Sequence, residues 1–452
     1  MIEPSRPGAA QAGLLSRLRA KTQRGLKHNI IILAALGVRG GAVVAGFAVT
    51  YLIGSNLGAA ATGQFALISQ TALFLSVVAL LGLNVSVVRH FTKAVAAKVP
   101  LALGSALSVA ALGFGLMLLV SLILWLGGDL VWKPLVGDSA PRTMLVVLCL
   151  LLIARGGVQL LGGMLRSQHS FTIGQAITVL FIPCVTAIAL ASGLVDTVHG
   201  ALWAAALGGL ASIILGSLVM VRHVGWGANT LHVRLNTVVA SSLPLWGVGI
   251  AQNIGDWYSL AVAAQMLSAA DAGLYRVGVQ IAMALQIVSK ALFSVYSAQI
   301  SAAFHASDRA LAARLANSAV KISGGIAIPV AIVLLFAGEF ILAQFGPEFE
   351  AAWPVLVILI VGQVASTLTG PCGLVLAMSG NERLNLAITI VYTALVLASV
   401  PVAAHFAGLA GIALSMSLAL LARNLTAFYF VRSREGINVW TGRVANRHQA
   451  SV

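Results

Sequence analysis

Long apolar runs separated by short polar stretches make up most of this chain. The runs lie near residues 29–53, 64–88, 101–126, 143–166, 171–192, 197–222, 239–266, 272–298, 319–344, 352–378, 386–407 and 410–431. An apolar run of about 20 residues is long enough to cross the hydrocarbon core of a bilayer as an α-helix. The pattern therefore predicts an all-α membrane protein with about twelve transmembrane helices.

A short motif occurs once in each half of the chain, just before the second apolar run of that half. Residues 57–70, LGAAATGQFALISQ, align with residues 267–280, LSAADAGLYRVGVQ, and Gly63 then coincides with Gly273. A motif repeated at one fixed spacing indicates a repeated structural unit. The alternative is that two turns rich in alanine and glycine resemble each other through composition alone. We interpret the motif as a repeat, which predicts two six-helix bundles.

These patterns divide the chain into five parts. They are a basic tail at 1–28, a first bundle at 29–222, a linker at 223–238, a second bundle at 239–431 and a basic tail at 432–452. Because six helices return the chain to its starting side, both bundles enter the membrane with the same polarity. Repeats of equal polarity are related by a pseudo-twofold axis along the membrane normal, and a transport path then lies between them.

The charged residues set the orientation of the helices. Only 9% of the residues are charged, against roughly 25% in soluble domains, and the net charge is +15. Lysine and arginine gather in the tails and in the predicted loops on the same side, at Arg89, Lys93, Lys98, Arg166, Arg222, Arg234, Arg309, Arg314, Lys321, Arg383, Arg432, Arg434, Arg443 and Arg447. Positive loops mark the cytoplasmic side of a membrane protein, so we expect both termini in the cytoplasm. The basic residues lack interleaved aromatics, and we expect no nucleic acid partner.

The sequence contains no recognisable catalytic motif. The three cysteines lie inside apolar runs, and the nine histidines are scattered without the spacing of metal ligands. Serine-hydrolase, zinc-protease and phosphate-binding glycine motifs do not occur. We therefore expect a protein that is not an enzyme and has no metal site and no cofactor.

Several polar residues lie inside the predicted transmembrane helices. An ionised side chain at the centre of a bilayer costs about 2.5–3.5 kcal/mol on insertion scales, so it usually faces a water-filled cavity. The candidate cavity residues are Arg39, Arg155, Gln159, Asp256, Arg276, Gln280, Lys290 and Gln363. Arg39, Arg155 and Lys290 outnumber the single buried acid, Asp256. This excess of positive charge predicts one central cavity that binds an anion.

Each of these residues also has a purely structural interpretation. Arg276 could lie at the membrane interface, and Asp256 could serve only to neutralise Arg39 or Lys290, because buried charges are normally paired. The glutamine side chains could join neighbouring helices through hydrogen bonds instead of binding a ligand.

Three further motifs, together with the repeated turn, resemble the polysaccharide transporters. They are LGLNVSVVRH at 81–90, LRSQHSF at 165–171 and AMSGNER at 377–383, and the likeness covers about residues 29–432. The chain is thus similar to Wzx-type flippases of the multidrug/oligosaccharidyl-lipid/polysaccharide (MOP) exporter superfamily. The related lipid II flippases carry two additional helices, which this sequence does not show.

The resemblance implies a V-shaped pair of bundles that alternates between two open states in the bacterial inner membrane. The implied substrate is an oligosaccharide linked to undecaprenyl pyrophosphate, with membrane lipids and a polysaccharide polymerase as further partners. The alternative is a multidrug or small-solute exporter of the same fold. Such exporters usually carry acidic residues in their first bundle, whereas residues 29–222 contain Arg39 and no acid within a predicted helix.

Overall fold

The computed structural model describes residues 8–127, 130, 143–168, 170–227 and 229–444. The N-terminal bundle, called the N-bundle below, contains α1 (Gly8–Ala79), α2 (Leu83–Ala96), α3 (Leu103–Gly127), α5 (Met144–Ser167), α6 (Phe171–Val179), α7 (Phe181–Ala191) and α8 (Val198–Val221). The C-terminal bundle, or C-bundle, contains α9 (Leu235–Val262), the π-helical turn η1 (Ala263–Leu267), α10 (Ala269–His305), α11 (Arg309–Ala343), the 3₁₀ turn η2 (Pro347–Ala352), α12 (Trp353–Thr369), α13 (Cys372–Met378) and α14 (Glu382–Glu435).

Two of these helices fold back on themselves and supply two crossings each. In α1 the break is at Gly58, whose φ of 84° is readily adopted only by glycine. In α14 the break is at Ala407 and Gly408. Hydrogen bonds join its two arms, between the hydroxyls of Ser399 and Ser415 at 2.6 Å and between those of Tyr392 and Thr426 at 2.7 Å, so the arms run antiparallel.

The described helices give each bundle six crossings, which confirms the predicted twelve-helix architecture. Seven helices are long and apolar enough to cross a membrane, and α6 with α7 forms an additional crossing bent by 46°. The chain is therefore a multi-pass membrane protein. The second arms of α1 and α14 supply two further crossings. The remaining crossings are α9, which carries Asp256, and α10, which carries Arg276 and Lys290.

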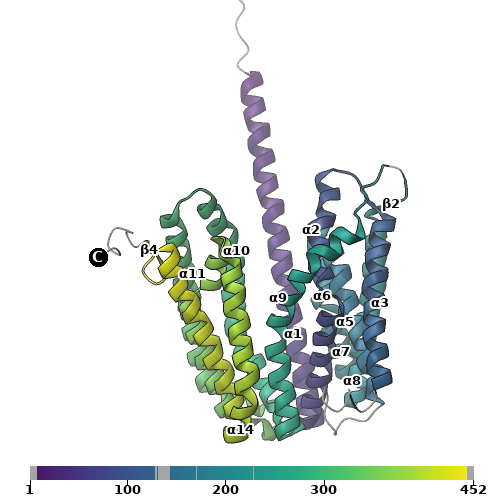
Figure 1. The fold of residues 1–452 in the computed structure, drawn as a ribbon, viewed down its shortest axis with the longest axis vertical. Coiled ribbons are helices and arrows are strands. Elements are labelled where there is room, and N and C mark those ends of the chain that lie inside the picture. The colour runs from purple at the N-terminus through teal and green to yellow at the C-terminus, as the bar shows by residue number, and fades with distance from the viewer. Residues whose placement is uncertain (1–7, 128–129, 131–142, 169, 228, 445–452) are drawn as a thin grey trace, which may run out of the picture.

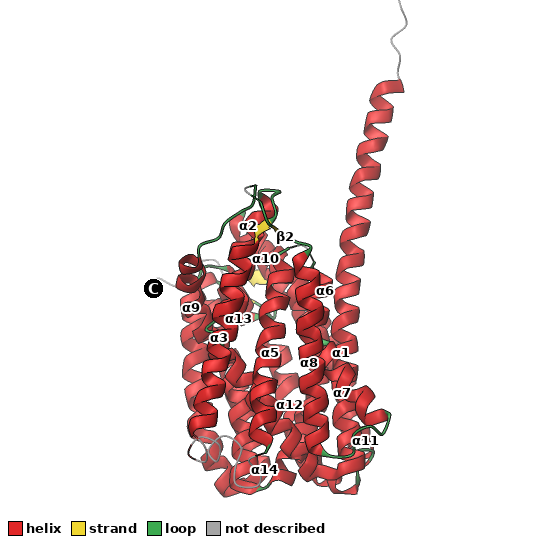
Figure 2. Cartoon of the chain, turned by 90° about the vertical axis from the view of Figure 1, so that its right-hand side faces the viewer, coloured by secondary structure: helices red, strands yellow, loops and turns green. Residues whose placement is uncertain are grey.

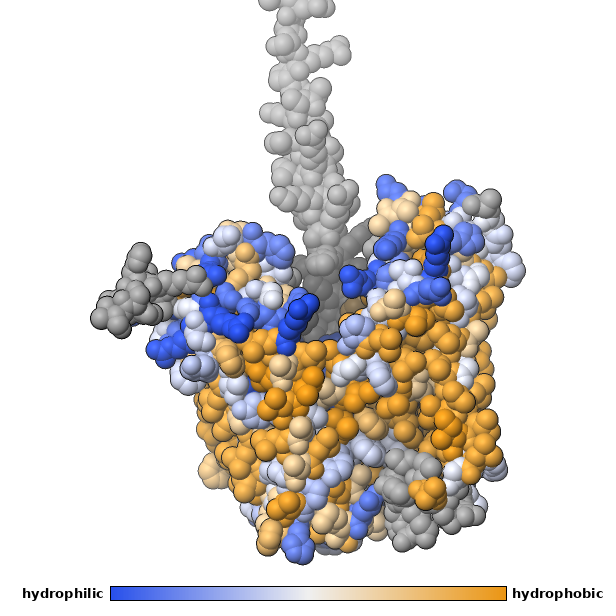
Figure 3. Space-filling view, in the orientation of Figure 1, coloured by the Kyte–Doolittle hydropathy of each residue, from blue (hydrophilic) through white to orange (hydrophobic). Residues whose placement is uncertain are grey.

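The two bundles meet at one face of the molecule and diverge toward the opposite face (Figure 1). We call the first the turn face, because the turns at Gly58 and Gly408 lie there, and the second the terminal face. The N-terminal part of α1 extends beyond the bundles at the terminal face, and the helices run roughly side by side between the two faces (Figures 1 and 2). Hydrophilic side chains gather at the terminal face above a broad apolar belt (Figure 3). This distribution fits a protein whose middle is surrounded by lipid.

A seam between α1 and α9 holds the bundles together. Trp257 stacks on Phe74 with 4.6 Å between ring centroids, and its indole N–H donates to the Thr71 hydroxyl at 3.0 Å. Closer to the terminal face, the Trp246 indole donates to the carbonyl of Val78 at 3.1 Å. α9 therefore packs on the N-bundle both in its middle and near its end, although it begins the C-bundle.

The linker and the tails differ from the expectation. α9 begins at Leu235, inside the predicted linker 223–238, since the polar residues of its first turn are compatible with a helix. Strand β2 (Val224–Gly225) pairs in parallel with β1 (Leu101–Ala102), which ties the linker to the N-bundle.

Both predicted tails contain regular structure. Residues 8–28 are the start of α1, because no proline occurs between Pro7 and Pro100 to interrupt the helix. At the other end, α14 continues to Glu435, and β3 (Ile437–Asn438) then pairs antiparallel with β4 (Arg443–Val444). The hairpin packs on the C-bundle through the Asn317 amide, which donates to the Val439 carbonyl at 3.0 Å.

Candidate transport cavity

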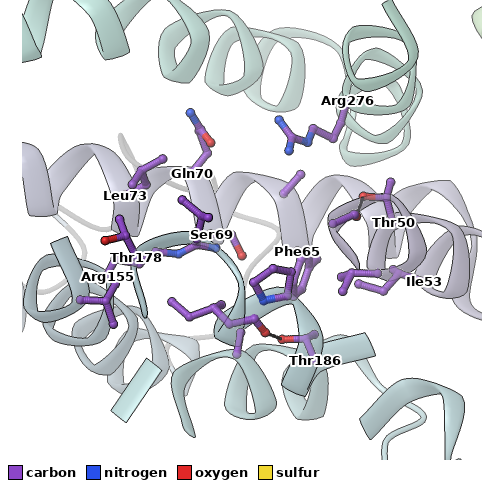
Figure 4. A pocket seen from close by; sticks show the side chains of 18 of the residues that line it. Thr50, Ile53, Phe65, Ser69, Gln70, Leu73, Arg155, Thr178, Thr186 and Arg276 are labelled. Carbon is purple, nitrogen blue, oxygen red and sulfur yellow. Dashed lines mark hydrogen bonds between the residues drawn. The ribbon is translucent and has the colours of Figure 1, made fainter. Parts of the chain in front are cut away.

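A cavity of about 470 Å³ lies where the two bundles face each other, and we call it the N-cavity (Figure 4). Both arms of α1 line it together with α5, α6, α7 and α8, and the C-bundle contributes Asn253 and Arg276 among the described residues. Thr50, Ser69, Gln70 and Thr178 are among the neutral polar residues of its wall. Because the break at Gly58 turns α1 back on itself, one helix presents residues to the cavity from both of its arms.

Arg155 enters the N-cavity from α5. In the described part of the chain its Nε atom is buried without a hydrogen-bond partner. One turn further along, Gln159 is held in place within the N-bundle. Its amide nitrogen donates to the Ser76 hydroxyl at 3.2 Å, and its oxygen accepts from the Asn84 amide at 3.2 Å. Gln159 thus lines the cavity and also joins helices, as both sequence interpretations proposed.

Arg276 reaches the same cavity from α10 of the C-bundle. Figure 4 shows Arg276 and Gln70 extending into the space between their two helices. The guanidinium groups of Arg276 and Arg155 repel each other electrostatically. Among the described residues that line the N-cavity, none is acidic. An anion placed here would therefore be attracted by one arginine from each bundle.

A second cavity of about 480 Å³, the C-cavity, lies within the C-bundle between α9, α10, α12 and α14. Its charged residues are Asp256, Lys290 and Arg423. A further cavity of about 320 Å³, the terminal extension, shares Lys290 and Arg423 with it and also contains Asn424. Planar amides and hydroxyls dominate the polar walls of these two cavities, contributed by Gln252, Gln286, Ser366, Gln363, Asn385, Thr389, Tyr392 and Thr393.

A narrow cavity of about 40 Å³ lies between the N-cavity and the C-cavity. Gln70, Asp256, Tyr275 and Arg276 are among its lining residues. Asp256 interacts electrostatically with Arg276 and with both cations of the C-cavity. The narrow cavity shares Gln70 and Arg276 with the N-cavity, and Asp256 and Tyr275 with the C-cavity, so a carboxylate and a guanidinium lie where the two larger cavities approach each other.

The structure separates residues that the sequence placed in one cavity. Arg155 lines the N-cavity, whereas Lys290 lines the C-cavity. Arg39 is exposed, lies close to Arg166, and is not among the described residues lining either cavity.

Arg39 lies nearer the terminal face than the predicted run 29–53 implies, because the first arm of α1 extends to Leu57. Nineteen residues at about 1.5 Å each separate Arg39 from Gly58. That is close to the thickness of the hydrocarbon core, about 30 Å, so Arg39 lies near the terminal face.

The two other glutamines bind protein groups. Gln280 accepts a hydrogen bond from the Thr50 hydroxyl at 2.8 Å, which links α10 to α1 across the bundles. Gln363 accepts from the amide of Gln286, and the pair forms part of the C-cavity wall. Both contacts correspond to the helix-joining interpretation, and Gln363 remains open to the C-cavity as well.

Sequence reasoning missed Arg423, although a signal for it was present. Arg423 lies inside the apolar run 410–431, where a charge is as costly as at the positions that were selected. Its position on the second arm of α14 brings it to the C-cavity beside Lys290. Asn253 on α9, which was not among the candidate cavity residues, lines the N-cavity.

The fold and these cavities define a class of membrane transporter, and comparisons with solved structures agree. The chain matches the inward closed conformation of the lipid II flippase MurJ with a TM-score of 0.70 at 11% identity, covering 88% of this chain and 87% of that one. An inward-facing multidrug resistance MATE family transporter of the MOP superfamily matches with a TM-score of 0.64 at 16% identity, covering 87% and 94%.

A MOP superfamily transporter from Pyrococcus furiosus matches with a TM-score of 0.59 at 14% identity, covering 90% of this chain and 94% of that one. A reversed polarity of its binding pocket suggests a different function for that transporter. At these identities the likeness shows the fold, which is the fold of the MOP superfamily. No curated protein sequence matches this chain.

The sequence profile of the family described as "Polysaccharide biosynthesis protein" matches residues 26–300, which is more than half of the chain. This chain belongs to that family.

Proposed function

We propose that this chain is a flippase that moves an oligosaccharide linked to undecaprenyl pyrophosphate across the bacterial inner membrane, for the synthesis of a surface polysaccharide. The observation that carries the proposal is the N-cavity, in which Arg155 and Arg276 face one space and no described lining residue is acidic. Asp256 lies near Arg276 but lines the narrow cavity and the C-cavity instead. Guanidinium groups bind phosphate oxygens through paired charge-assisted hydrogen bonds. A pyrophosphate would supply the negative charge that balances these two arginines.

The C-cavity and its terminal extension suit the sugar part of such a substrate. Together they offer amides such as Gln252 and Asn424 and hydroxyls such as Thr393. These groups both donate and accept hydrogen bonds, as the hydroxyls of a glycan require. The lipid chain would stay in the bilayer while the head group occupies the cavities.

Orientation follows from the charge distribution. The helix ends and loops at the terminal face carry basic residues such as Arg89, Lys98 and Arg314, whereas the turn face carries Glu348 and Glu350. Under the positive-inside rule the terminal face is cytoplasmic. The bundles diverge toward that face, so the conformation described here would receive substrate from the cytoplasm, where lipid-linked sugars are assembled.

A multidrug exporter of the same fold is the second candidate. A cationic drug needs an acidic or neutral cavity, and the N-cavity has two arginines instead. The charge of the cavity therefore favours the anionic substrate.

The experiment compares Arg155→Gln and Arg276→Gln with the exposed control Arg314→Gln. Purified protein in lipid nanodiscs is titrated with farnesyl pyrophosphate, and cells carrying each variant are assayed for surface polysaccharide. We expect each cavity variant to weaken binding by about tenfold to a hundredfold, as for a lost hydrogen bond to a charged group. The same variants should also make lipid-linked oligosaccharide accumulate inside the cell. Normal binding and export by both cavity variants would refute the proposal.

A further inference from the structure

The second arm of α1 starts at the turn face without a capping side chain of its own. The first N–H groups of a helix have no partner within the helix and are usually satisfied by a Ser, Thr, Asp or Asn side chain at the N-cap. The residue at the break is Gly58, and the residue three positions later is Ala61. Neither can accept a hydrogen bond through its side chain.

The corresponding helix of the C-bundle, α10, is capped from within its own sequence. In the repeat, Gly58 aligns with Ser268 and Ala61 aligns with Asp271. The Ser268 hydroxyl accepts a hydrogen bond from the Asp271 N–H at 3.0 Å and donates to the Asp271 carboxylate at 2.6 Å. The two copies of the motif therefore differ in their caps, although the turns are otherwise alike.

In the N-bundle the missing acceptor is supplied by the other bundle. The backbone N–H of Ala59 donates to the carboxylate of Glu348, which belongs to η2 in the C-bundle. A carboxylate at a helix N-terminus is also favoured by the partial positive charge there. Within the described part of the chain, the N-bundle helix is thus capped by a contact between bundles.

Apolar packing holds η2 against the N-bundle around this contact. Phe345 and Phe349 are 1% and 0% exposed. Phe345 meets Phe47 and Tyr51 edge to face, with ring centroids 5.3 Å and 5.6 Å apart. Gly54 leaves room for this segment, since a β-carbon there would lie 3.2 Å from the Phe349 ring. These contacts bring Glu348 to the helix N-terminus while the turn face is closed.

We propose that Glu348 is a latch that holds the turn face closed. When the bundles separate at this face, Ala59 moves away from Glu348, and the second arm of α1 loses the cap that it cannot replace. The lost hydrogen bond favours the closed turn face over the open one. The corresponding helix of the C-bundle, α10, keeps its cap when the bundles separate, because Ser268 and Asp271 move together with it. The latch depends on the contact between bundles and is independent of which substrate the cavities bind.

The test measures the distance between the bundles at the turn face. Spin labels are placed at Ser192→Cys and His405→Cys, which are exposed near this face in the N-bundle and the C-bundle, in a chain whose native cysteines are replaced by alanine. Pulsed electron paramagnetic resonance in nanodiscs then reports the populations of the closed and open forms. We expect Glu348→Ala to raise the ratio of open to closed turn face by about fivefold to tenfold, since the lost bond involves a charged but partly exposed group. Glu348→Gln should give a smaller shift, because an amide oxygen still accepts the bond.

A second substitution separates a latch from an ordinary helix cap. Ala61→Asp, added to Glu348→Ala, places a carboxylate in the first turn of the helix, where Asp271 stands in the other repeat. Its charge favours the helix N-terminus in both conformations. A latch predicts that this double variant stays shifted toward the open form. Return of the double variant to the wild-type distribution would show that Glu348 only stabilises the helix and would overturn the proposal.

The control is Glu350→Ala, which removes an exposed carboxylate from the same turn, two residues from Glu348. It should leave the distance distribution unchanged. A shift equal to that of Glu348→Ala would indicate a general charge effect at the turn face, and an unshifted Glu348→Ala would equally contradict the latch.

Discussion

Gly63 on α1 and Gly273 on α10 make a reciprocal contact at the turn face. A β-carbon on Gly63 would overlap the carbonyl oxygen of Ala269, and a β-carbon on Gly273 would overlap the carbonyl oxygen of Ala59. In the repeat, Ala59 aligns with Ala269 and Gly63 aligns with Gly273. Each contact is therefore the image of the other under a twofold rotation, as in an isologous interface. The repeated motif is the place where the two bundles touch.

Replacing either glycine by leucine should prevent closure at the turn face. The added side chain would meet the backbone of the opposite helix, which cannot move aside as a flexible side chain can. We expect Gly63→Leu and Gly273→Leu to abolish transport and to favour the open turn face in the spin-label measurement. Overpacking of this kind typically costs about 1–3 kcal/mol.

The control for this prediction is Gly325→Leu on α11, where a β-carbon would meet no atom within 4 Å. It should retain transport and the wild-type distance distribution. Normal transport by both Gly63→Leu and Gly273→Leu would show that the turn face need not close as tightly as this contact indicates.

The C-cavity should recognise the glycan without affecting the binding of pyrophosphate. Gln252→Leu removes an amide that faces both the C-cavity and its terminal extension. We expect it to slow the export of lipid-linked oligosaccharide by about tenfold, as for one lost hydrogen bond to a neutral group. The affinity for farnesyl pyrophosphate, which has no sugar, should change by less than about twofold.

Arg155→Gln is the reference for that comparison, since it should weaken the binding of farnesyl pyrophosphate itself. If Gln252→Leu weakened farnesyl pyrophosphate binding as strongly as Arg155→Gln does, the two cavities would not divide the substrate in the proposed way.

The orientation of the chain can be tested with single cysteines. Ser192 follows α7 at the turn face, and Ser307 lies between α10 and α11 at the terminal face, and both are exposed. In intact cells under a permeable outer membrane, an impermeant maleimide should label Ser192→Cys and spare Ser307→Cys. Disruption of the inner membrane should make both cysteines reactive. The reverse pattern in intact cells would place the termini outside.

The C-terminal hairpin should contribute to the stability of the C-bundle. Trp440 stacks on Phe428 with ring centroids 4.4 Å apart, and its indole N–H donates to the Leu368 carbonyl at 2.8 Å. We expect Trp440→Ala to lower the free energy of unfolding by about 1–3 kcal/mol, measured as a fall in melting temperature in detergent. Trp226→Ala, at a tryptophan that is 80% exposed, should leave the melting temperature unchanged. Equal melting temperatures for the two variants would show that the hairpin is only loosely held.

The sequence by itself determined the class of fold. Inside a bilayer every backbone polar group must be bonded within the protein, so a long apolar run has few choices other than a helix. The run at 101–126 accordingly corresponds to α3 at Leu103–Gly127. Helix ends at the membrane surface were less well determined, because water can satisfy the backbone there. α11, for example, begins ten residues before its apolar run, at Arg309.

The candidate site was determined in part. Arg155 was found because a charge inside an apolar run is costly wherever the neighbouring helices lie. The same argument did not identify the residue that faces Arg155 across the cavity. The sequence favoured Arg39 and Lys290 as partners, and the structure places Arg276 opposite Arg155. Arg423 joins Lys290 in a separate cavity.

Only the tertiary structure decided these groupings, and the reason is physical. The transfer free energy of a residue depends on its own chemistry and can be read along the chain. The set of residues that share a cavity depends on how each helix is rotated and where it bends. For this chain the break at Gly58 and the contact between Gly63 and Gly273 set that arrangement. Close packing between helices 210 residues apart has no signature in local hydropathy. It follows from which surfaces fit together once the bundles have formed.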